Sequence, residues 1–375
     1  SRNGVSMSSK LFSPIRLAEL ELPNRIVVPP MCQYSADDGC ANDWHMTHLG
    51  MLANSGAGLV VVEATHVTRP GRITHGCLGL YSDANEAALK RVIDHCKRIG
   101  KSKFGIQLAH AGRKASTQRP WEGGKGLHRN GGDEPWETMG PSGATFGAEW
   151  PSPREMTAED FKHAADAFVQ AAERAVRIGF DAIELHMAHG YLMHSIQSPL
   201  SNQRTDEYGP SRQAGWRYLF DTVAAVRAAV PRAIPLGARI TGSDWQDGGL
   251  TTDDAVEFAR GLKEAGLDFL DVSSGGARAD IRNPTAPGYN VPAAERVRRE
   301  AGIPSRAVGL VTTPQQAEDI VAEGKADMVA IGRAFLDDPH WAWEAARQLG
   351  GEVERPNQYL RVGRSLWSGV SKPRT

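Results

Sequence analysis

The sequence lacks long apolar runs and contains very little cysteine. Its longest apolar stretches, such as GLVVVEA from Gly58, are far shorter than the roughly 20 residues that a membrane-spanning helix needs. Only four cysteines occur among 375 residues, and none of them stand in a C-x-x-C spacing. This usage argues against a disulfide framework and favours a reducing compartment, which we expect to be the cytoplasm.

An excess of charge of either sign is also lacking. Lys and Arg number 43 and Asp and Glu number 44, so the formal net charge is -1. That balance gives no reason to expect nucleic acid or a membrane surface as a partner. The first twelve residues contain no apolar core of a secretory signal. A hydrophobic fraction of 41% and a charged fraction of 23% are typical of an ordinary globular protein.

Eight short apolar or β-branched segments recur along the chain, with helical patterns between them. They begin at Arg25, Gly58, Lys103, Ala182, Pro235, Phe269, Ser305 and Met328. Strands that alternate with helices are typical of parallel βαβ units. Eight such units favour a single (β/α)8 TIM barrel over residues 11–350, followed by a C-terminal tail over 351–375. A doubly wound open sheet is the alternative.

The helical segments have recognisable ends, and two connections are long. The helix expected after Thr157 has that residue as its N-cap and stops at Gly179. Residues 111–156, after the third strand, are rich in Gly, Pro and Trp. A connection of this length in a compact domain is usually functional, for example as a lid. Residues 190–215, after the fourth strand, form the second long connection.

Polar residues cluster where the expected strands end. Reacting groups of (β/α)8 barrels lie at the carboxyl ends of the strands. In this sequence those positions hold Cys32, Gln33, Tyr34, Glu63, Ala64, Thr65, Gln107, His110, His186, His189, Tyr191, Arg239, Ser273, Ser274, Gly332 and Arg333.

The most unusual group is His186-x-x-His189-x-Tyr191. Residues three apart on a straight strand face opposite sides, so a shared metal ion would require a bend there. A Schiff-base enzyme is disfavoured because it needs a lysine at the carboxyl end of a strand, whereas Lys103 lies at the opposite end. A buried core histidine is a plain alternative. In a third interpretation, two imidazole N–H groups stabilise negative charge on a substrate oxygen while Tyr191 donates a proton.

Glycines follow the seventh and eighth strands. Gly309 and Gly332 stand where phosphate groups commonly bind in such barrels, and Arg333 adds a positive charge. A tight turn is the alternative role of each glycine. No G-x-G-x-x-G opens a strand–helix unit, so a Rossmann-bound dinucleotide is not indicated. A phosphate site beside an oxyanion site and a proton donor suggests FMN.

Several longer motifs carry a family resemblance. The segments PNRIVVPPMCQYSA, RITHGCLGLYSD, IQLAHAGRKAS, IELHMAHGYL, SPLSNQRTDEYG and VAIGRAFLDDP resemble the Old Yellow Enzyme family. Cys32, Tyr34 and the terminal QYLR resemble its thermophilic-like branch, which includes xenobiotic reductases. The resemblance extends from Leu11 to Arg361. One departure follows RTDEYG, where Ala214 and Gly215 replace the Asn and Arg that are usual in the family.

The resemblance implies an FMN-containing barrel that takes hydride from NADPH or NADH and reduces activated C=C bonds of α,β-unsaturated carbonyl compounds. His186 and His189 would bind the substrate carbonyl oxygen, and Tyr191 would protonate the α-carbon. Tyr34 would contact the substrate, and Arg361 would reach into the site of a neighbouring subunit in a homodimer or homotetramer. The cofactor would be held by Pro29, Pro30, Met31, Cys32, Ala64, Gln107, Arg239, Gly309, Gly332 and Arg333. A metal-dependent TIM-barrel hydrolase is the alternative function.

Overall fold

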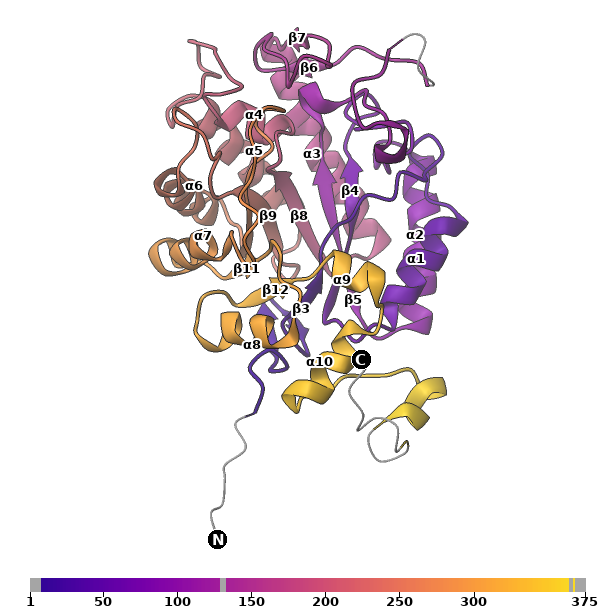
Figure 1. Cartoon of the computed structure of the whole chain (residues 1–375). Helices are drawn as coiled ribbons and strands as arrows, with labels where there is room; N and C mark the ends of the chain where they lie inside the picture. The colour runs from indigo at the N-terminus through magenta and orange to yellow at the C-terminus, as the bar shows by residue number, and fades with distance from the viewer. Residues whose placement is uncertain (1–7, 129–132, 364–366, 368–375) are drawn as a thin grey trace.

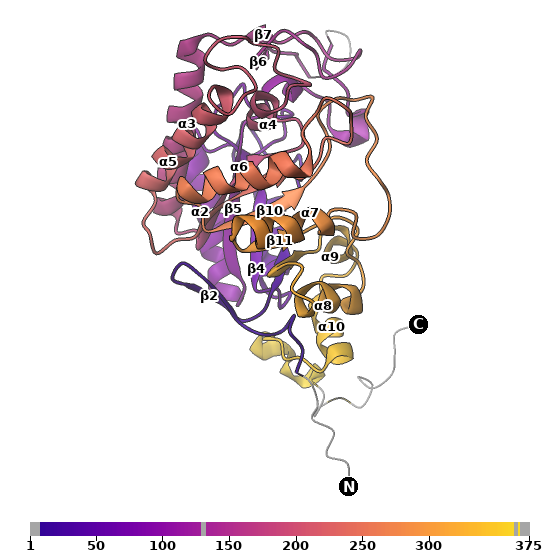
Figure 2. The same ribbon diagram turned by 90° about the vertical axis from the view of Figure 1, so that its left-hand side faces the viewer.

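The computed structural model describes residues 8–128, 133–363 and 367, and its centre is a closed parallel barrel (Figures 1 and 2). The barrel contains β3 (Ile26–Val28), β4 (Leu59–His66), β5 (Lys103–Ala109), β8 (Ala182–Met187), β9 (Leu236–Thr241), β10 (Phe269–Ser273), β11 (Ser305–Ala307) and β12 (Met328–Ala330). Its neighbouring strands pair in the order β10-β11-β12-β3-β4-β5-β8-β9. All eight expected strands are therefore present, and the predicted TIM barrel is confirmed rather than the open sheet.

Helices surround the barrel. The longer ones are α1 (Asp43–Ala53), α2 (Asp83–Ile99), α3 (Ala158–Ile178), α5 (Gly215–Ala229), α6 (Thr252–Glu264), α8 (Pro314–Ala322) and α10 (Trp341–Leu349). Short helices α4 (Leu192–Gln197), α7 (Val291–Arg296) and α9 (Arg333–Asp337) lie between them. α3 begins as predicted, because Thr157 accepts from the backbone N–H of Asp160 and Asp160 caps Thr157 in return, and it ends at Gly179 with φ 99°. No helix in the described ranges is long and apolar enough to cross a membrane.

A small hairpin that the sequence did not predict closes the amino end of the barrel. β1 (Ile15–Leu17) and β2 (Leu20–Leu22) pair antiparallel. Leu17 and Leu22 are buried against the inward-facing Val27, Leu59 and Phe269. Three-residue strands give too short an alternation to recognise in a sequence. The hairpin supplies an apolar floor that excludes water from below the barrel.

The long connection after β5 is not a plain loop. It contains two 3₁₀ turns, η1 (Gly112–Lys114) and η2 (Pro120–Glu122), and the paired β6 (Met139–Gly140) and β7 (Arg154–Glu155). Figures 1 and 2 both show β6 and β7 at the end of the molecule opposite α10. Because the connection leaves the carboxyl end of β5, it lies over the end of the barrel where the polar residues gather.

Alternation along the strands divides the barrel interior into three layers. On β8, Ala182 packs in the apolar layer near the hairpin, Glu184 lies in the middle layer, and His186 lies in the layer toward the carboxyl end. The same three levels on β10 hold Phe269, Asp271 and Ser273. The interior therefore changes from apolar through charged to polar in the direction of the predicted site.

The departure at Ala214 and Gly215 alters the start of α5, which has no side-chain cap. The backbone N–H of Gly215 donates to the carbonyl of Gly209 at 2.6 Å, and a β-carbon at position 215 would lie 2.6 Å from that oxygen. Glycine is therefore required for this close approach. Asn202 holds the preceding loop by donating to the carbonyl oxygens of Ile196 and Tyr208, at 2.8 Å each.

Candidate active site

The chain bends sharply where β8 ends, and the bend brings His186, His189 and Tyr191 together. β8 ends at Met187, and His189 (φ 61°) and Gly190 (φ 77°) both adopt left-handed backbone conformations. The ring centroids of His186 and His189 are 5.1 Å apart, and those of His186 and Tyr191 are 4.8 Å apart. Residues 186 and 189 could act together only if the strand bent between them, and the structure contains this bend.

Hydrogen bonds determine which imidazole nitrogens can donate. The backbone N–H of Ala188 donates to Nδ1 of His186 at 3.3 Å, so the proton of a neutral His186 ring is on Nε2. Nε2 of His189 lies 2.8 Å from the hydroxyl oxygen of Ser273. Burial lowers the pKa of His186 well below its usual value and lowers the pKa of His189 to about 3. Both rings are thus neutral near pH 7 and act as hydrogen-bond donors without carrying charge.

Buried side chains from other elements hold the bend. His194 accepts from the backbone N–H of Gly190 at 2.7 Å through Nδ1, and its Nε2 pairs with a carboxylate oxygen of Asp244 at 2.8 Å. Nζ of Lys114 donates to the carbonyl of His189 at 2.6 Å. A left-handed non-glycine residue costs of order 1–3 kcal/mol and persists only where its surroundings fix it. These contacts provide that fixation for His189.

Cys32, Tyr34 and Tyr191 share a small apolar cluster with Ile73 and Cys77. The Tyr34 hydroxyl and the Cys32 thiol lie close enough for each to shift the pKa of the other. Burial raises the pKa of the thiol and of both phenols well above their usual values. Near pH 7 each of these groups therefore keeps its proton, and Tyr191 is available as a proton donor.

The middle layer of the barrel is a buried network of charges. Arg306 donates at 2.6 Å to Glu184 and at 2.6 Å to Asp271, and Nε of Arg239 donates at 2.9 Å to Asp271. Gln107 donates to the other oxygen of Glu184 at 3.1 Å. Two guanidinium groups thus balance two carboxylates, which makes the burial of all four charges tolerable. The network links Gln107 to Arg239 across the barrel.

A cavity of about 240 Å³ opens beside Arg239. It is lined by Pro29, Pro30, Met31, Arg239, residues 308–312, Ala330, Gly332, Arg333 and Ala334. No side chain caps the first turn of α9, which begins here and so leaves backbone N–H groups available. Arg333 is the first residue of α9, so its guanidinium adds a permanent positive charge to the cavity wall.

The glycines of this cavity allow the backbone to approach a ligand. Gly309 has φ 111°, and a β-carbon there would lie 2.7 Å from the side-chain nitrogen of Asn290. Backbone N–H groups, an uncapped helix start and a guanidinium form a suitable donor set for a phosphate. The residues present therefore fit the phosphate end of FMN.

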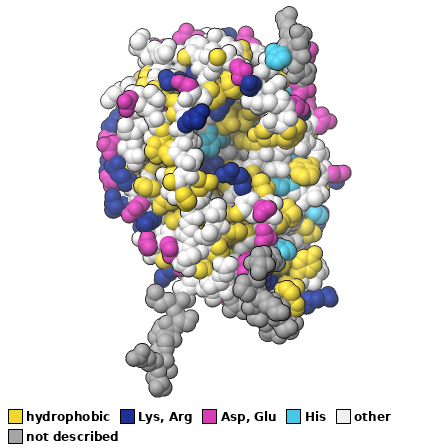
Figure 3. Space-filling view, in the orientation of Figure 1, with side chains coloured by type: hydrophobic (Ala, Val, Ile, Leu, Met, Phe, Trp, Pro, Cys, Tyr) yellow, Lys and Arg dark blue, Asp and Glu magenta, His cyan; other side chains and the backbone are white. Residues whose placement is uncertain are grey.

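Figure 3 shows a hollow in the surface with a histidine side chain at its bottom and Lys or Arg side chains beside it. The predicted site residues fall into three groups at the carboxyl end of the barrel. His186, His189 and Tyr191 form the first, and Cys32 and Tyr34 join Tyr191 through the apolar cluster. The cavity residues form the second group. Gln107 and Arg239, in the charged network, form the third group, and the backbone of Ala64 lies near the Cys32 thiol, whose pKa it lowers.

Arg361 is not part of this assembly. It lies exposed in η4 (Asn357–Val362), where the neighbouring Tyr359 packs edge-on against Trp343. Trp343 lies beside Gly56, which precedes β4 and so marks the amino end of the barrel. Arg361 can therefore contribute to a site of this kind only in another subunit.

Several site residues were missing from the sequence-based set. Glu184 and Asp271 stand two positions before His186 and Ser273 on otherwise apolar strands, so strict alternation could have placed them below the site. Arg306, in the middle of β11 (SRA), is the cation that pairs with both of these carboxylates. Lys114 lies in the loop after β5, within the motif IQLAHAGRKAS, but nothing in the sequence showed that it contacts the bend after β8.

The described residues place no group of three His, Cys, Asp or Glu side chains where it could hold a metal ion.

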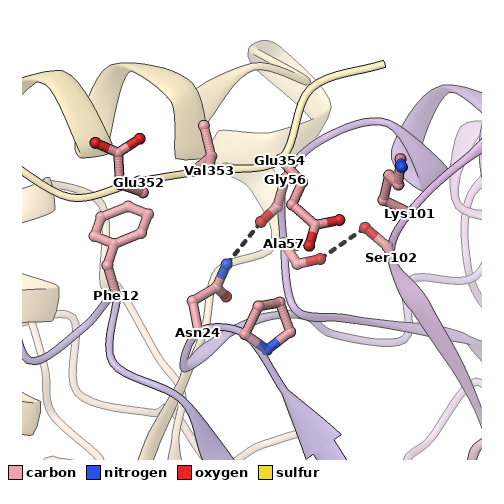
Figure 4. A pocket seen from close by; sticks show the side chains of 10 residues that line it. Phe12, Asn24, Gly56, Ala57, Lys101, Ser102, Glu352, Val353 and Glu354 are labelled. Carbon is pink, nitrogen blue, oxygen red and sulfur yellow. Dashed lines mark hydrogen bonds between the residues drawn. The ribbon is translucent and has the colours of Figure 1, made fainter. Parts of the chain in front are cut away.

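A separate hollow of about 260 Å³, which we call the lower hollow, lies at the amino ends of β3, β4 and β5. Figure 4 shows Phe12, Asn24 and Ser102 around it, with Glu352 and Glu354 from the chain after α10.

Comparisons with known proteins agree with this geometry. The model of the NADH:flavin oxidoreductase / NADH oxidase family matches residues 10–352. An NADPH dehydrogenase from Geobacillus thermodenitrificans is 43% identical over 360 residues, which cover 95% of this chain and 99% of that protein. One from Listeria innocua is 42% identical, with 94% and 99% covered. The structure of morphinone reductase superposes with a TM-score of 0.75 at 24% identity, covering 94% and 93%, and supports the fold.

Proposed function

Because the chain belongs to the NADH:flavin oxidoreductase / NADH oxidase family, we propose that it reduces the activated C=C bond of α,β-unsaturated carbonyl compounds. The resemblance to the Old Yellow Enzymes is confirmed, and the protein is a flavin oxidoreductase with FMN as cofactor and a nicotinamide nucleotide as reductant. The metal-dependent hydrolase alternative is therefore wrong. Reduction of enones and the roles of individual residues are our proposal.

The cofactor would be held by residues at the carboxyl ends of six strands, β3, β4, β5, β9, β11 and β12. Arg333 and the backbone at Gly309 and Gly332 would bind its phosphate, since they form the donor set of the cavity. Pro29, Pro30, Met31, Cys32 and Ala64 would line the ring system, and Gln107 and Arg239 would donate hydrogen bonds to it. Bound FMN supplies the hydride, and positive charge such as that of Arg239 stabilises a reduced, anionic ring.

The observation that carries the proposal is the clustering of His186, His189 and Tyr191, in which burial favours neutral imidazoles and a protonated phenol. Nε2–H of His186 is free to donate, and Nδ1–H of His189 is free when the Ser273 hydroxyl donates to Nε2. Two such donors polarise a carbonyl oxygen and stabilise the charge that develops on it. Tyr191 then gives its proton to the α-carbon, and Tyr34 contacts the rest of the substrate.

Assembly and location are also part of the proposal. Arg361 would enter the site of a second subunit in a homodimer or homotetramer, because it lies exposed and remote from the site of its own chain. The balanced net charge of -1 favours small molecules over nucleic acid or membranes as partners. We keep the cytoplasm as the expected compartment.

An anaerobic spectral titration tests the function. The purified protein should show flavin absorbance, lose it on addition of NADPH, and regain it on addition of cyclohexenone. Tyr191→Phe should slow the last step by roughly 10²–10⁴-fold and leave reduction by NADPH unchanged. A flavin that NADPH bleaches but no enone restores would contradict the proposed substrate class.

A further inference from the structure

Lys114 occupies an unusual position at the candidate active site. It ends η1, directly after β5, and its half-buried side chain extends toward the bend after β8. Its ammonium nitrogen lies 4.7 Å from the ring centroid of Tyr191 and 4.4 Å from that of Phe146. Its hydrogen bond to the carbonyl of His189 fixes it there. The positive charge is therefore held over the face of the tyrosine that we propose as proton donor.

Among the described residues, no carboxylate pairs with the charge of Lys114. Lys114 forms no ion pair with an Asp or Glu in the part of the chain that the structure describes, whereas the buried Arg306 pairs with both Glu184 and Asp271. An ammonium that is partly removed from water without a carboxylate nearby is costly to keep charged. A purely structural lysine would be better replaced by an apolar residue at this place, so the position calls for a functional explanation.

We propose that Lys114 is a positioning residue for proton donation, whose ammonium stabilises the tyrosinate that remains when Tyr191 gives up its proton. This inference rests on the proposed function. A cation over the face of an aromatic ring is attracted by the ring, and the attraction grows when the ring oxygen becomes negative. The hydrogen bond to His189 lets the same ammonium hold the bend that aims both residues.

The step balances without a further reactant. The hydride adds to the β-carbon, the π electrons of the C=C bond move onto the α-carbon and the carbonyl oxygen, and the new C–H bond forms at the α-carbon with the proton from Tyr191. The oxygen of Tyr191 keeps the electron pair of its broken O–H bond. Water then returns a proton to that oxygen and closes the cycle.

The same geometry makes the effect depend on pH. Burial, with a smaller contribution from Arg113, lowers the pKa of Lys114 to about 7. Lys114 is therefore charged below about pH 7 and becomes neutral as the pH rises through that value, so its help to Tyr191 is lost on the alkaline side. The ionisable groups that face it are Arg113 of its own turn, His186 and His189 from β8 and the bend after it, and Tyr191 before α4.

Single-turnover oxidation of the NADPH-reduced holoenzyme by cyclohexenone, followed from about pH 5.5 to 9, tests this role. The wild-type rate should fall as the pH rises through about 7. Lys114→Met should be roughly tenfold slower at low pH and lack this dependence. Lys114→Arg should keep its rate at pH 9, because a guanidinium stays charged. Lys125→Met, which removes an exposed lysine paired with Glu149, should match the wild type.

A double variant separates action through Tyr191 from general damage. In a Tyr191→Phe background, Lys114→Met should cause a much smaller loss of rate than it does in the wild type, because no tyrosinate forms there and only the support of the bend at His189 is lost. An equal loss with and without the tyrosine hydroxyl, or a wild-type rate in Lys114→Met, would overturn the proposal. A wild-type rate in Tyr191→Phe would also overturn it, since the proton would then come from elsewhere.

A second readout needs no turnover. Lysines carrying ¹³C-methyl groups report their own titration by NMR, and the signal missing from Lys114→Arg identifies Lys114. That signal should titrate near pH 7 in the FMN-loaded protein. Titration near the ordinary lysine value of about 10.4 would overturn the charge switch. If the signal titrates near pH 7 but enones never restore the flavin spectrum, the proposed reaction is wrong, while the lowered pKa of Lys114 is still established.

Discussion

The two ends of the barrel are both hollowed, yet they differ in chemistry. The cavity beside Arg239 measures about 240 Å³ and the lower hollow about 260 Å³, so volume does not distinguish them. In the lower hollow the buried polar side chains, Asn24 and Ser102, are hydrogen-bonded. Asn24 accepts from the backbone N–H groups of Ile26 and Gly58 at 3.1 and 2.9 Å and donates to the carbonyl of Gly56 at 2.8 Å.

At the carboxyl end the backbone is strained and charge is incompletely paired. Tyr34 and His189 adopt left-handed conformations, two buried histidines stay neutral, and Lys114 lacks a carboxylate partner among the described residues. Such features cost free energy, and they persist in proteins mainly where function requires them. A left-handed Ala18 also occurs in the hairpin at the amino end, so strain alone does not separate the two ends. The comparison teaches that strain combined with neutral buried histidines and a lysine without a described carboxylate partner identifies the functional end better than empty space does.

The largest effect should come from the charged layer beneath the site. Asp271→Ala removes the carboxylate shared by Arg239 and Arg306 and should lower the free energy of unfolding by about 3–5 kcal/mol, since two buried cations lose a partner. Urea denaturation measures this loss. Asp280→Ala, at an exposed surface pair with Arg278, is the control and should change little. An equal, small effect of both variants would show that the buried network does not support the site.

Removing one imidazole should affect the reaction rather than the fold. His186→Ala should slow oxidation of the reduced enzyme by an enone by about 10²–10³-fold, or about 2.7–4 kcal/mol, because one of two donors to the developing charge is lost. Stopped-flow absorbance of the flavin measures the rate. His163→Ala, on the exposed face of α3, should leave it unchanged. A loss below about threefold would remove His186 from the proposed mechanism.

A substitution at the lower hollow should have the opposite result and affect stability rather than the reaction rate. Asn24→Ala leaves the buried N–H groups of Ile26 and Gly58 with fewer partners and should cost about 1–3 kcal/mol of stability. The rates of both half-reactions should stay at wild-type values, because the lower hollow lies at the opposite strand ends. A slower reaction in an Asn24→Ala protein that remains folded would contradict the conclusion that only the carboxyl end of the barrel takes part in the reaction.

The smallest effect concerns the tail. Truncation after Asn357, or Arg361→Ala, should weaken binding of an enone or of a phenol inhibitor by a few fold, since an exposed charge contributes about 0–1 kcal/mol. Flavin absorbance changes on ligand titration measure the affinity. The difference in affinity between the variant and the wild type should disappear when both are diluted until the oligomer dissociates, because the wild-type site then also lacks Arg361 of a partner subunit. An unchanged affinity would show that no partner subunit completes the site.

The sequence predicted the eight strands, the barrel and the residues around the bend because each depends on local signals. Strand ends such as HMAH carry polar residues after apolar runs, and helix ends carry caps and glycines. The hairpin of β1 and β2 was missed because three residues show no clear period. Glu184, Asp271 and Lys114 were missed because their meaning depends on neighbours from distant strands and loops.

The central claim is that the two imidazoles and Tyr191 act on one substrate beside the FMN. A crystal structure of the FMN-loaded protein with bound cyclohexenone tests it most directly. We expect the ketone oxygen within about 3.2 Å of Nε2 of His186 and Nδ1 of His189, with the Tyr191 hydroxyl facing the α-carbon. A ketone oxygen bound by other side chains, or a metal ion between the two rings, would contradict the account.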